Sequence, residues 1–557
     1  MIEARATLPL CDIGVRLEQL LRSYRFDDVR QARDGWAAAD EETCQAILDG
    51  ADRLAREVLE PLNLTMDRMG CTLADGRVKT VDGHKEAWGD YVAGGWPTLE
   101  APEPVGGQEL PAALAFAAQE IFDRACPAFG MLPVPQRSAS RVIAAHCDDA
   151  TREEWLERLS SGEWGATICV SEAGAGSDLS RIRTSADQDA TGKWRITGEK
   201  VWISFGDHDL AERIGHIVLA RTREEDGRMR PSLFLVPSVL ADGTANQVYV
   251  HRIEEKLGLH GSPTCALGFE EAQGILLGTS GRGLAQLFVM IANMRLAVGA
   301  MGLGIASASL DVARQYASER LQGGRPEPLP IERHADVRLQ LLDIHAPVHL
   351  LRGLLYAVAN LNDLAATGDE GAGLLSAWLL PLVKTLGGEV AFDSASAAIQ
   401  VLGGAGYTQD WPVEQALRDA RVLMIFEGTT GMQASDLVLR RLIDNSASFD
   451  AFMKAARALS DPALNACLDT LEKAANWLRK NPDKAEAGAT AFLHLAGVAT
   501  FAWIGAGYVE EDSAGQPASQ ALAVAARHWL QSAPAKAVWF RTQVEAGAAL
   551  AARYAAL

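Results

Sequence analysis

Hydrophobic and polar positions change their spacing along the chain, and these changes divide it into four stretches. The first and third carry apolar residues at helical intervals, and the helices of the third are long enough for a bundle. The second consists of short β-prone runs separated by turn residues, and the fourth is Ala-rich and helical. We therefore predict an α+β fold that is mainly α, with an N-terminal helical domain (1–163), a central β-domain (164–278), a C-terminal four-helix-bundle domain (279–443) and a C-terminal helical extension (444–557).

Proline positions and one long apolar run refine the helical part of this picture. Pro462, Pro482 and Pro517 mark expected helix breaks in the extension. The apolar run at residues 491–509 contains His494 and several glycines. We therefore predict that it forms a buried helix and does not span a membrane.

Net charge and the spacing of cysteines argue against several kinds of binding partner and site. The 557 residues carry a formal net charge of −20, and a field of that sign repels phosphate backbones and anionic lipid. We therefore expect neither nucleic acid nor a membrane as a partner. The eight cysteines form no C-x-x-C pair, so no metal site or disulfide framework is expected. Glu3 and Asp12 break the basic, acid-poor pattern of a transit peptide, which favours a cytoplasmic location.

Two short motifs lie in the β-region. The segment CVSEAGAGSD at residues 169–178 follows a β-prone run, and its glycines allow a ligand to approach the backbone closely while Ser171 and Ser177 add hydroxyls. Taken alone, this segment is more typical of a tight turn than of a ligand site. Trp202 opens the tripeptide Trp-Ile-Ser at the end of a predicted strand. It fits a core or rim position, or equally one wall of a site for a planar cofactor.

Two further motifs lie in the bundle region. The segment QVLGGAGY at residues 400–407 ends a long helix, and its glycines fit a C-cap that approaches another group closely or a simple loop. Glu427 follows the apolar run VLMIF and precedes Gly428. A carboxylate placed there loses solvation, which raises its pKa and suits it to accept a proton. Taken alone, Glu427 fits a capping or solvent-exposed carboxylate better than a base.

In this order and spacing, the four motifs resemble those of the acyl-CoA dehydrogenase family. CVSEAGAGSD resembles its first signature, QVLGGAGYTQDWP followed by RDAR resembles the second, WIS resembles the flavin-wall tripeptide, and IFEGT resembles the segment that bears the catalytic Glu. The resemblance covers residues 30–443 directly. The N-terminal lead and the tail resemble the extended branch that contains methylthiopropanoyl-CoA dehydrogenases. The resemblance implies the acyl-CoA dehydrogenase fold, bound FAD and assembly as a homodimer or homotetramer.

The resemblance also implies which residues contact cofactor and substrate. The FAD contacts it implies in the same chain are Val170, Ser171, Ser177, Trp202, Ser204 and Thr429. The contacts it implies with the adenosine and pyrophosphate end of a neighbouring subunit's FAD are Arg320, Gln400, Gly403 and Gly404. The substrate contacts it implies are Ser177, Met294, Arg295 and Gly428.

The reaction implied by the resemblance is α,β-dehydrogenation of an acyl-CoA thioester to the trans-2-enoyl-CoA. Glu427 would remove the α-proton while the β-hydrogen leaves as a hydride to the flavin, and electron-transfer flavoprotein would then take the electrons. The backbone N–H of the base and an FAD hydroxyl would stabilise charge on the thioester carbonyl oxygen. Some family members carry the base immediately before the residue matching Arg295. Here that residue is Met294, which cannot accept a proton, so Glu427 is the one candidate base.

Three residues depart from the family pattern. Arg181, Gln415 and Gly431 differ from the usual signature residues, and Gly431 puts one flavin contact in doubt.

The acyl group and two alternative functions stay open. We expect methylthiopropanoyl-CoA or a short or medium acyl-CoA as substrate. The alternatives are a DNA-binding flavoprotein of alkylation response, which the acidic charge opposes, and an acyl-CoA oxidase, which depends on oxygen access to the flavin.

Overall fold

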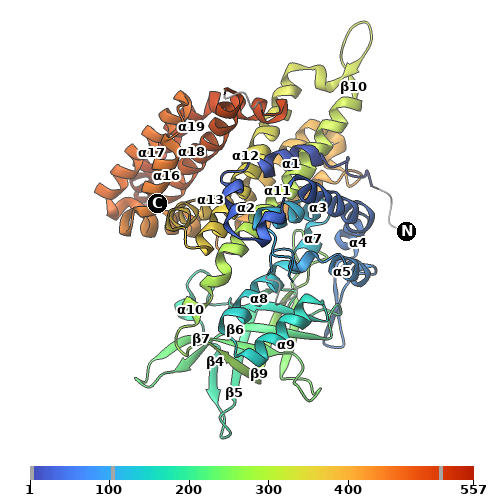
Figure 1. The fold of residues 1–557 in the computed structure, drawn as a ribbon, viewed down its shortest axis with the longest axis vertical. Helices are drawn as coiled ribbons and strands as arrows, with labels where there is room; N and C mark the ends of the chain where they lie inside the picture. The colour runs from blue at the N-terminus through green and yellow to red at the C-terminus, as the bar shows by residue number, and fades with distance from the viewer. Residues whose placement is uncertain (1–4, 102–106, 514–517) are drawn as a thin grey trace. The chain divides into compact units, whose positions relative to one another are not determined.

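The computed structural model describes residues 5–101, 107–513 and 518–557, which Figure 1 traces. The chain forms two compact units. Unit 1 contains Arg53–Leu110 and Ala125–Met294, and unit 2 contains Ala4–Asp52, Pro111–Arg124 and Arg295–Leu557. The boundaries of the four predicted domains stay a prediction.

Unit 1 combines short helices with a β-sheet. Its helices α8 and α9 pack against β3, the first strand of the sheet. The helical segments of unit 1 are η2 (Ala55–Leu59), α4 (Glu60–Met69), α5 (His84–Ala93), η3 (Trp96–Thr98), α7 (Pro127–Gly130), α8 (Pro133–His146), α9 (Asp149–Ser160), η5 (Leu179–Arg181) and α10 (Gly283–Gln286).

Seven strands form the main sheet of unit 1. Along the chain they are β3 (Trp164–Cys169), β4 (Ser185–Gln188), β5 (Trp194–Ser204), β6 (Arg213–Arg223), β7 (Met229–Pro237), β8 (Val248–Ile253) and β9 (Thr264–Leu277). Their order is β3-β6-β4-β5-β9-β7, with β8 added to β9. Because β6 also pairs with β7, five of the strands close into a ring. A separate hairpin joins β1 (Thr72–Ala74) to β2 (Arg77–Lys79).

Alternating side chains of these strands form the core of the sheet. Ile196 and Ile203 on β5, Val218 on β6, Phe234 on β7 and Phe269 on β9 are fully or almost fully buried in one cluster. Burying large apolar side chains from several strands stabilises each by about 1.5–3 kcal/mol relative to exposure. The predicted β-region therefore has a hydrophobic core of its own, and this core fixes the strand ends that carry the first two motifs.

Unit 2 is helical apart from one small hairpin, β10 (Leu321–Gln322) with β11 (Leu329–Pro330). Its central helices are α11 (Phe288–Glu319), α12 (Ala335–Ala366) and α13 (Glu370–Leu402). The other helical segments are α1 (Ile13–Leu21), α2 (Phe26–Ala32), η1 (Gly35–Ala38), α3 (Glu41–Leu54), α6 (Ala112–Ala125), η6 (Ile331–Arg333), η7 (Gly403–Tyr407), α14 (Val413–Ala420), η8 (Arg421–Met424), α15 (Thr430–Ser435) and η9 (Asp436–Asp444).

The C-terminal extension continues unit 2 as four helices and a short turn of helix. They are α16 (Ala447–Arg457), α17 (Pro462–Lys480), η10 (Pro482–Lys484), α18 (Ala485–Ser513) and α19 (Gln520–Ala555). The predicted breaks at Pro462 and Pro482 are confirmed, because α17 and η10 begin there, whereas Pro517 lies outside the described residues. Helices α18 and α19 pack on α12, and α16 packs on α13.

Glycines bring α11 and α13 unusually close together. A Cβ atom on Gly302 would lie 2.1 Å from the carbonyl oxygen of Gly387, and one on Gly387 would lie 2.7 Å from the Cα atom of Gly299. No side chain fits into such a gap, so the two backbones meet directly. This close crossing positions the middle of α13, which carries residues near Glu427.

A buried polar network ties the N-terminal lead and the extension to the bundle. The Glu120 carboxylate on α6 accepts hydrogen bonds from Arg16 on α1, at 3.0 Å, and from Arg352 on α12, at 2.7 Å. Arg352 also donates to Gln19 at 2.8 Å, and Gln19 donates to the hydroxyl of Tyr508 on α18 at 2.9 Å. Burial alone would raise the pKa of Glu120, but Arg16 and Arg352 lower it to about 2. The network therefore holds a permanent negative charge between two cations.

Among the residues that the structure describes, four helical segments are long and apolar enough to cross a membrane by length and composition alone. They are Phe288–Glu319, Ala335–Ala366, Glu370–Tyr407 and Pro482–Glu510. Between 72% and 83% of the apolar window of each is buried inside the protein, so packing accounts for their composition. The run at 491–509 lies in α18 and is buried, as predicted.

Candidate active site

The first motif is fixed to the neighbouring strand by a buried lysine. Lys200 on β5 is fully buried, and its Nζ donates to the carbonyl of Val170 at 3.0 Å and to the Glu172 carboxylate at 2.8 Å. The backbone N–H of Val201 donates to the carbonyl of Ser171 at 3.0 Å. The structure therefore brings Val170 and Ser171, at the end of β3, beside the segment of β5 that leads into Trp202.

Trp202 lies at an irregularity of β5 in a strained conformation. Its φ is +64°, and the register with β9 shifts between Lys200 and Ile203. A positive φ is rare for a bulky residue and persists only where the surrounding structure enforces it. The indole is 60% exposed, whereas the next residue, Ile203, lies in the core. Ser204 is half-buried on the side of the strand opposite Ile203. A strained, exposed tryptophan fits a cofactor wall better than a core position.

The glycines of the first motif form a tight turn. The backbone N–H of Glu172 donates to the carbonyl of Ala175 at 3.0 Å, and that of Ala175 donates back to Glu172 at 3.0 Å. Cβ atoms built on Gly174 and Gly176 would meet nothing within 4 Å, so this backbone is open to approach. Ser177 follows the turn and is exposed. The turn interpretation is therefore correct, and a ligand role for Ser177 stays a prediction.

Truncating Trp202 tests the cofactor wall. We expect Trp202→Ala to weaken FAD binding by roughly tenfold or more, because the flavin would lose the aromatic face and the area it covers. Tyr249→Ala, which removes another exposed aromatic ring from the same sheet, should leave FAD content unchanged. The FAD content of the purified proteins and its release on dilution give the comparison. Equal retention of FAD by Trp202→Ala and the wild type would remove Trp202 from the cofactor site.

Glu427 lies between η8 and α15 in a second strained segment. Its φ is +55°, and that of Gly428 is +89°. The buried Gln433 side chain donates from Nε2 to the Glu427 carbonyl at 3.0 Å. Thr429 caps α15 by accepting from the backbone N–H of Met432 at 3.3 Å. Hydrogen bonds at Glu427 and at Thr429 therefore hold the backbone of this strained segment.

Two cations act on the Glu427 carboxylate. Burial raises its pKa above the usual range for a glutamic acid, while the charges of Lys384 and Arg295 act in the opposite direction. Solvent nevertheless reaches the residue, which is exposed when its backbone and side chain are taken together. Its pKa responds to the protein atoms that crowd around the carboxyl group. A glutamate whose carboxyl has a raised pKa suits a general base.

Three of the predicted substrate residues, Met294 and Arg295 on α11 and Gly428 beside Glu427, differ from one another in burial and in bonding partners. Met294 is almost fully buried. Arg295 pairs with Asp436 on η9 at 3.3 Å, and Asp436 also pairs with Arg441 at 3.0 Å. Gly428 is half-buried, and its carbonyl accepts a hydrogen bond from Lys384 at 2.6 Å. Arg295 and Gly428 therefore belong to the group of residues around Glu427, and their contacts with substrate stay predictions.

The residues predicted to contact a neighbouring subunit's FAD lie far from Glu427 along the fold. Gln400, Gly403 and Gly404 are exposed at the end of α13, and Cβ atoms on either glycine would meet open space. Gln400 follows Lys384 by sixteen residues in the same helix, a separation of about 24 Å at 1.5 Å per residue. Arg320 is also exposed and follows the end of α11. One chain therefore does not gather these residues around its own Glu427.

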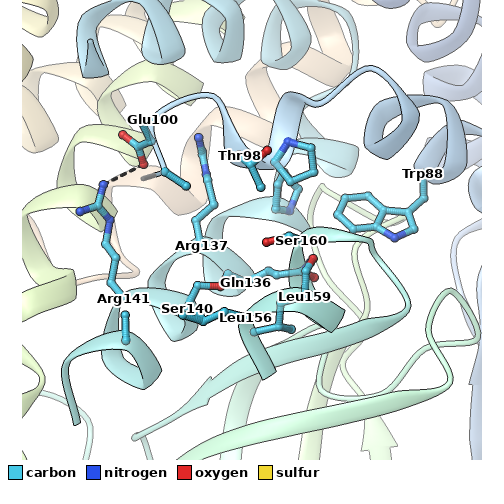
Figure 2. Close-up of a pocket in the computed structure, with 14 residues that line it drawn as sticks. Trp88, Thr98, Glu100, Gln136, Arg137, Ser140, Arg141, Leu156, Leu159 and Ser160 are labelled. Carbon is cyan, nitrogen blue, oxygen red and sulfur yellow. Dashed lines mark hydrogen bonds and ion pairs between the residues drawn. The ribbon is translucent and has the colours of Figure 1, made fainter. Parts of the chain in front are cut away.

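A small pocket of about 170 Å³ in unit 1 was not foreseen from the sequence (Figure 2). Arg141 on α8 lines it and donates to the Glu100 carboxylate at 2.8 Å, and Asn293 donates to the same oxygen at 3.1 Å. Burial would raise the pKa of Glu100, but Arg141 and Arg137 lower it. Arg137 and Arg141 lie one turn apart on α8, but Glu100 and Asn293 are far from them in the sequence, so no motif singles out the group.

The structure adds three residues to the surroundings of Glu427. Lys384 and Gln433 bond the peptides of the Glu427–Gly428 segment. Gly388 lets α13 touch η8, because its Cβ would lie 2.9 Å from the Leu423 carbonyl carbon. The one sequence signal among them was a lysine in the otherwise apolar run WLLPLVKTLGG.

Comparisons with known proteins agree with the motifs. Models of the acyl-CoA dehydrogenase family match the N-terminal domain at residues 41–163, the middle domain at 167–272 and the C-terminal domain at 281–443. The chain belongs to the acyl-CoA dehydrogenase family, and it is an FAD-dependent acyl-CoA dehydrogenase.

The relatives include members that match nearly the whole chain. The 3-methylmercaptopropionyl-CoA dehydrogenase of Ruegeria pomeroyi is 34% identical in an alignment of 531 positions that covers 89% of this chain and 89% of the relative. The broad-specificity linear acyl-CoA dehydrogenase FadE5 of Mycobacterium tuberculosis is 35% identical over 376 residues, covering 63% of this chain and 61% of FadE5. Since only 11% of this chain lies outside the alignment with the first relative, at least part of the extension at residues 444–557 is included in it.

Solved structures show the same fold. ACDH-11 of Caenorhabditis elegans in complex with C11-CoA gives a TM-score of 0.78 at 19% identity, covering 96% of this chain and 93% of ACDH-11. An acyl-CoA dehydrogenase of Bacillus anthracis complexed with FAD gives 0.77 at 19% identity, covering 94% and 90%. The predicted acyl-CoA dehydrogenase fold with a C-terminal extension is thereby confirmed.

Proposed function

We propose that this enzyme oxidises an acyl-CoA thioester to the trans-2-enoyl-CoA, with Glu427 as the base that removes the α-proton. The observation that carries this proposal is the state of Glu427 itself. Its carboxyl has a raised pKa, the residue as a whole is exposed, and its strained backbone is held by Gln433 and Lys384. A structure that enforces strain at a carboxylate with a raised pKa supports a chemical role for it.

The backbone around Glu427 supports a second part of the proposal. Within the described ranges, no acceptor takes a hydrogen bond from the Glu427 N–H, whereas the N–H of Phe426 donates to Val422 at 3.1 Å. A free donor on the base itself suits a thioester carbonyl, whose oxygen gains charge as the α-proton leaves. Stabilising that charge is needed because a thioester α-proton is far too weakly acidic for a free carboxylate.

The residues fit FAD, the cofactor of this enzyme class. In unit 1, Trp202 presents an exposed indole, and Val170, Ser171 and Ser204 lie on the same two strand ends. When bound, FAD supplies the acceptor for the β-hydride. Within unit 2, the distance of Gln400 and Gly404 from Glu427 supports the proposal that they hold the adenosine end of a neighbouring subunit's FAD. Assembly as a homodimer or homotetramer is part of this proposal.

We propose methylthiopropanoyl-CoA or a short or medium acyl-CoA as substrate, electron-transfer flavoprotein as electron acceptor, and a cytoplasmic location. The nearly full-length match to a 3-methylmercaptopropionyl-CoA dehydrogenase supports the first of these. The net charge of −20 opposes the DNA-binding alternative. An oxidase would differ by releasing peroxide in air.

Anaerobic titration of the purified flavoprotein with acyl-CoA thioesters tests the proposed substrate. Methylthiopropanoyl-CoA, butyryl-CoA, octanoyl-CoA and palmitoyl-CoA are compared by the loss of the visible flavin absorbance. We expect full bleaching by at least one of the first three and a rate for palmitoyl-CoA at least tenfold lower. Electron-transfer flavoprotein should restore the colour faster than air does. Fastest bleaching by palmitoyl-CoA would overturn the proposed substrate class. Rapid peroxide release in air would overturn electron-transfer flavoprotein as the electron acceptor.

A further inference from the structure

Lys384 is a buried cation with an unusual partner. It lies in the middle of α13, its side chain is fully buried, and its Nζ donates to the carbonyl of Gly428 at 2.6 Å. Within the described part of the chain, this is its one hydrogen bond, and no carboxylate lies within ion-pair distance of it. Placing an ammonium group in such a position is costly, since a buried charge normally needs a paired carboxylate.

Holding the loop does not by itself require a positive charge. Gln433, which is neutral, already donates to the Glu427 carbonyl at 3.0 Å. The other cation near Glu427, Arg295, is paired with Asp436 at 3.3 Å. Lys384 therefore supplies a charge that no neighbouring ion pair compensates. Burial lowers the pKa of Lys384 to about 8, and the charge of Glu427 acts in the opposite direction.

We propose that Lys384 is a positioning residue for Glu427, which fixes the Gly428 peptide through its ammonium group and favours the ionised form of the Glu427 carboxylate. The inference rests on the proposed role of Glu427 as the base. A neutral residue at position 384 would retain at most the first function. Proton abstraction requires the ionised carboxylate, so the second function sets the pH range in which the enzyme works.

Two charged groups act on Glu427, Arg295 on α11 and Lys384 on α13. Glu389 on α13 acts in turn on Lys384, and Asp436 and Arg441 on η9 act on Arg295. Lys384 lowers the pKa of Glu427, so removing its charge raises that pKa further. The rate of flavin reduction then rises with pH over a higher range than in the wild type. At pH values below this higher range, the variant has less ionised Glu427 than the wild type, and we expect its flavin to be reduced about tenfold more slowly.

Stopped-flow reduction of the holoenzyme across pH tests the inference. The probe is the acyl-CoA thioester that bleaches the wild-type flavin fastest in the anaerobic titration. In Lys384→Met we expect the ascending limb of the reduction rate to move to higher pH, with acyl-CoA affinity within about threefold of the wild type. Lys384→Arg keeps the charge and should keep the limb in place. Lys536→Met, which removes a lysine of lowered pKa from α19, is the matched control and should not move the limb.

A structural role alone would give a different result. If Lys384→Met lowers the rate equally at every pH, Lys384 does not act on the ionisation of Glu427 and the inference is wrong. If Lys384→Met does not retain FAD, Lys384→Gln decides, because it can still donate to Gly428 and lacks the charge. Glu427→Gln tests the base assignment separately from the role of Lys384. An active Glu427→Gln enzyme overturns the base assignment. If Glu427→Gln is inactive but the ascending limb does not move in Lys384→Met or Lys384→Gln, only the role of Lys384 is overturned.

Discussion

Replacing Glu427 by Gln is expected to lower the rate of flavin reduction by acyl-CoA by roughly 1,000-fold while FAD stays bound. A positioned general base contributes about 10²–10⁴-fold, and the amide of Gln cannot accept the α-proton. The two side chains have the same shape, so the bonds from Gln433 and Lys384 to the backbone carbonyls of the loop remain available. Rapid anaerobic mixing with substrate, monitored through the flavin absorbance, gives the rate.

A carboxylate in the same part of the chain provides the control. Glu414 on α14 pairs with Arg418 at 2.9 Å and is partly buried, and Glu414→Gln should keep the wild-type rate within about threefold. Both variants should carry wild-type amounts of FAD. A Glu427→Gln enzyme that reduces its flavin as fast as Glu414→Gln would show that another group removes the proton.

The second large effect concerns stability. Glu120→Ala is expected to lower the free energy of unfolding of unit 2 by about 3–5 kcal/mol, because it leaves Arg16 and Arg352 buried without their shared carboxylate. The two arginines have 4% and 2% of their side-chain surface exposed, so solvent cannot replace the lost partner. Urea unfolding followed by far-ultraviolet circular dichroism measures the change.

An exposed ion pair in the same unit is the matched control. Glu472 on α17 pairs with Arg457 at 3.0 Å, and about half of its side-chain surface is exposed. Glu472→Ala should therefore change the unfolding free energy by less than about 1 kcal/mol. Equal midpoints for Glu120→Ala and Glu472→Ala would contradict the role of the buried network.

The same network has a defined pH dependence. The pKa of Glu120 is about 2 in the folded protein, below its ordinary value of 4.5. A depressed pKa contributes stability that is fully present above pH 4.5 and is lost as the pH falls toward 2. Acid therefore weakens the attachment of α1 and α18 to the bundle, because a neutral Glu120 leaves the two arginine charges uncompensated.

Much of the fold was predictable because its signals are local. Short β-prone runs with turn residues predicted the strands of unit 1, and prolines predicted where α17 and η10 begin. The family was predictable for a different reason, since four motifs keep their order and spacing. Isolated from one another, the same motifs fitted turns, caps or core positions.

The surroundings of Glu427 were less accessible to sequence reasoning. Lys384 precedes Glu427 by 43 residues, and only packing of α13 against η8 brings its Nζ to the Gly428 carbonyl. Gly302 and Gly387 permit the helix crossing, and nothing in an isolated helix distinguishes such glycines from destabilising ones. Glu120, Arg16 and Arg352 likewise lie more than 100 residues apart and meet only in the folded core.

The strained conformation of Trp202 could also not be predicted from the sequence. The tripeptide predicted a strand end, and the structure shows a register shift that turns the indole outward at a φ of +64°. Strain of this kind depends on pairing with β9, which lies about 60 residues later in the chain. Trp202 and Glu427, for which we propose roles at the active site, are among the non-glycine residues with a positive φ.

Proton exchange at the α-carbon tests the central claim most directly. The probe is 3,3-dimethylbutanoyl-CoA, which has α-hydrogens but no β-hydrogen, so proton removal can occur without oxidation. In deuterium oxide the wild-type holoenzyme is expected to incorporate deuterium at the α-carbon, as measured by mass spectrometry, while Glu427→Gln incorporates it roughly 1,000-fold more slowly. Exchange by Glu427→Gln at the wild-type rate would contradict the assignment of Glu427 as the base.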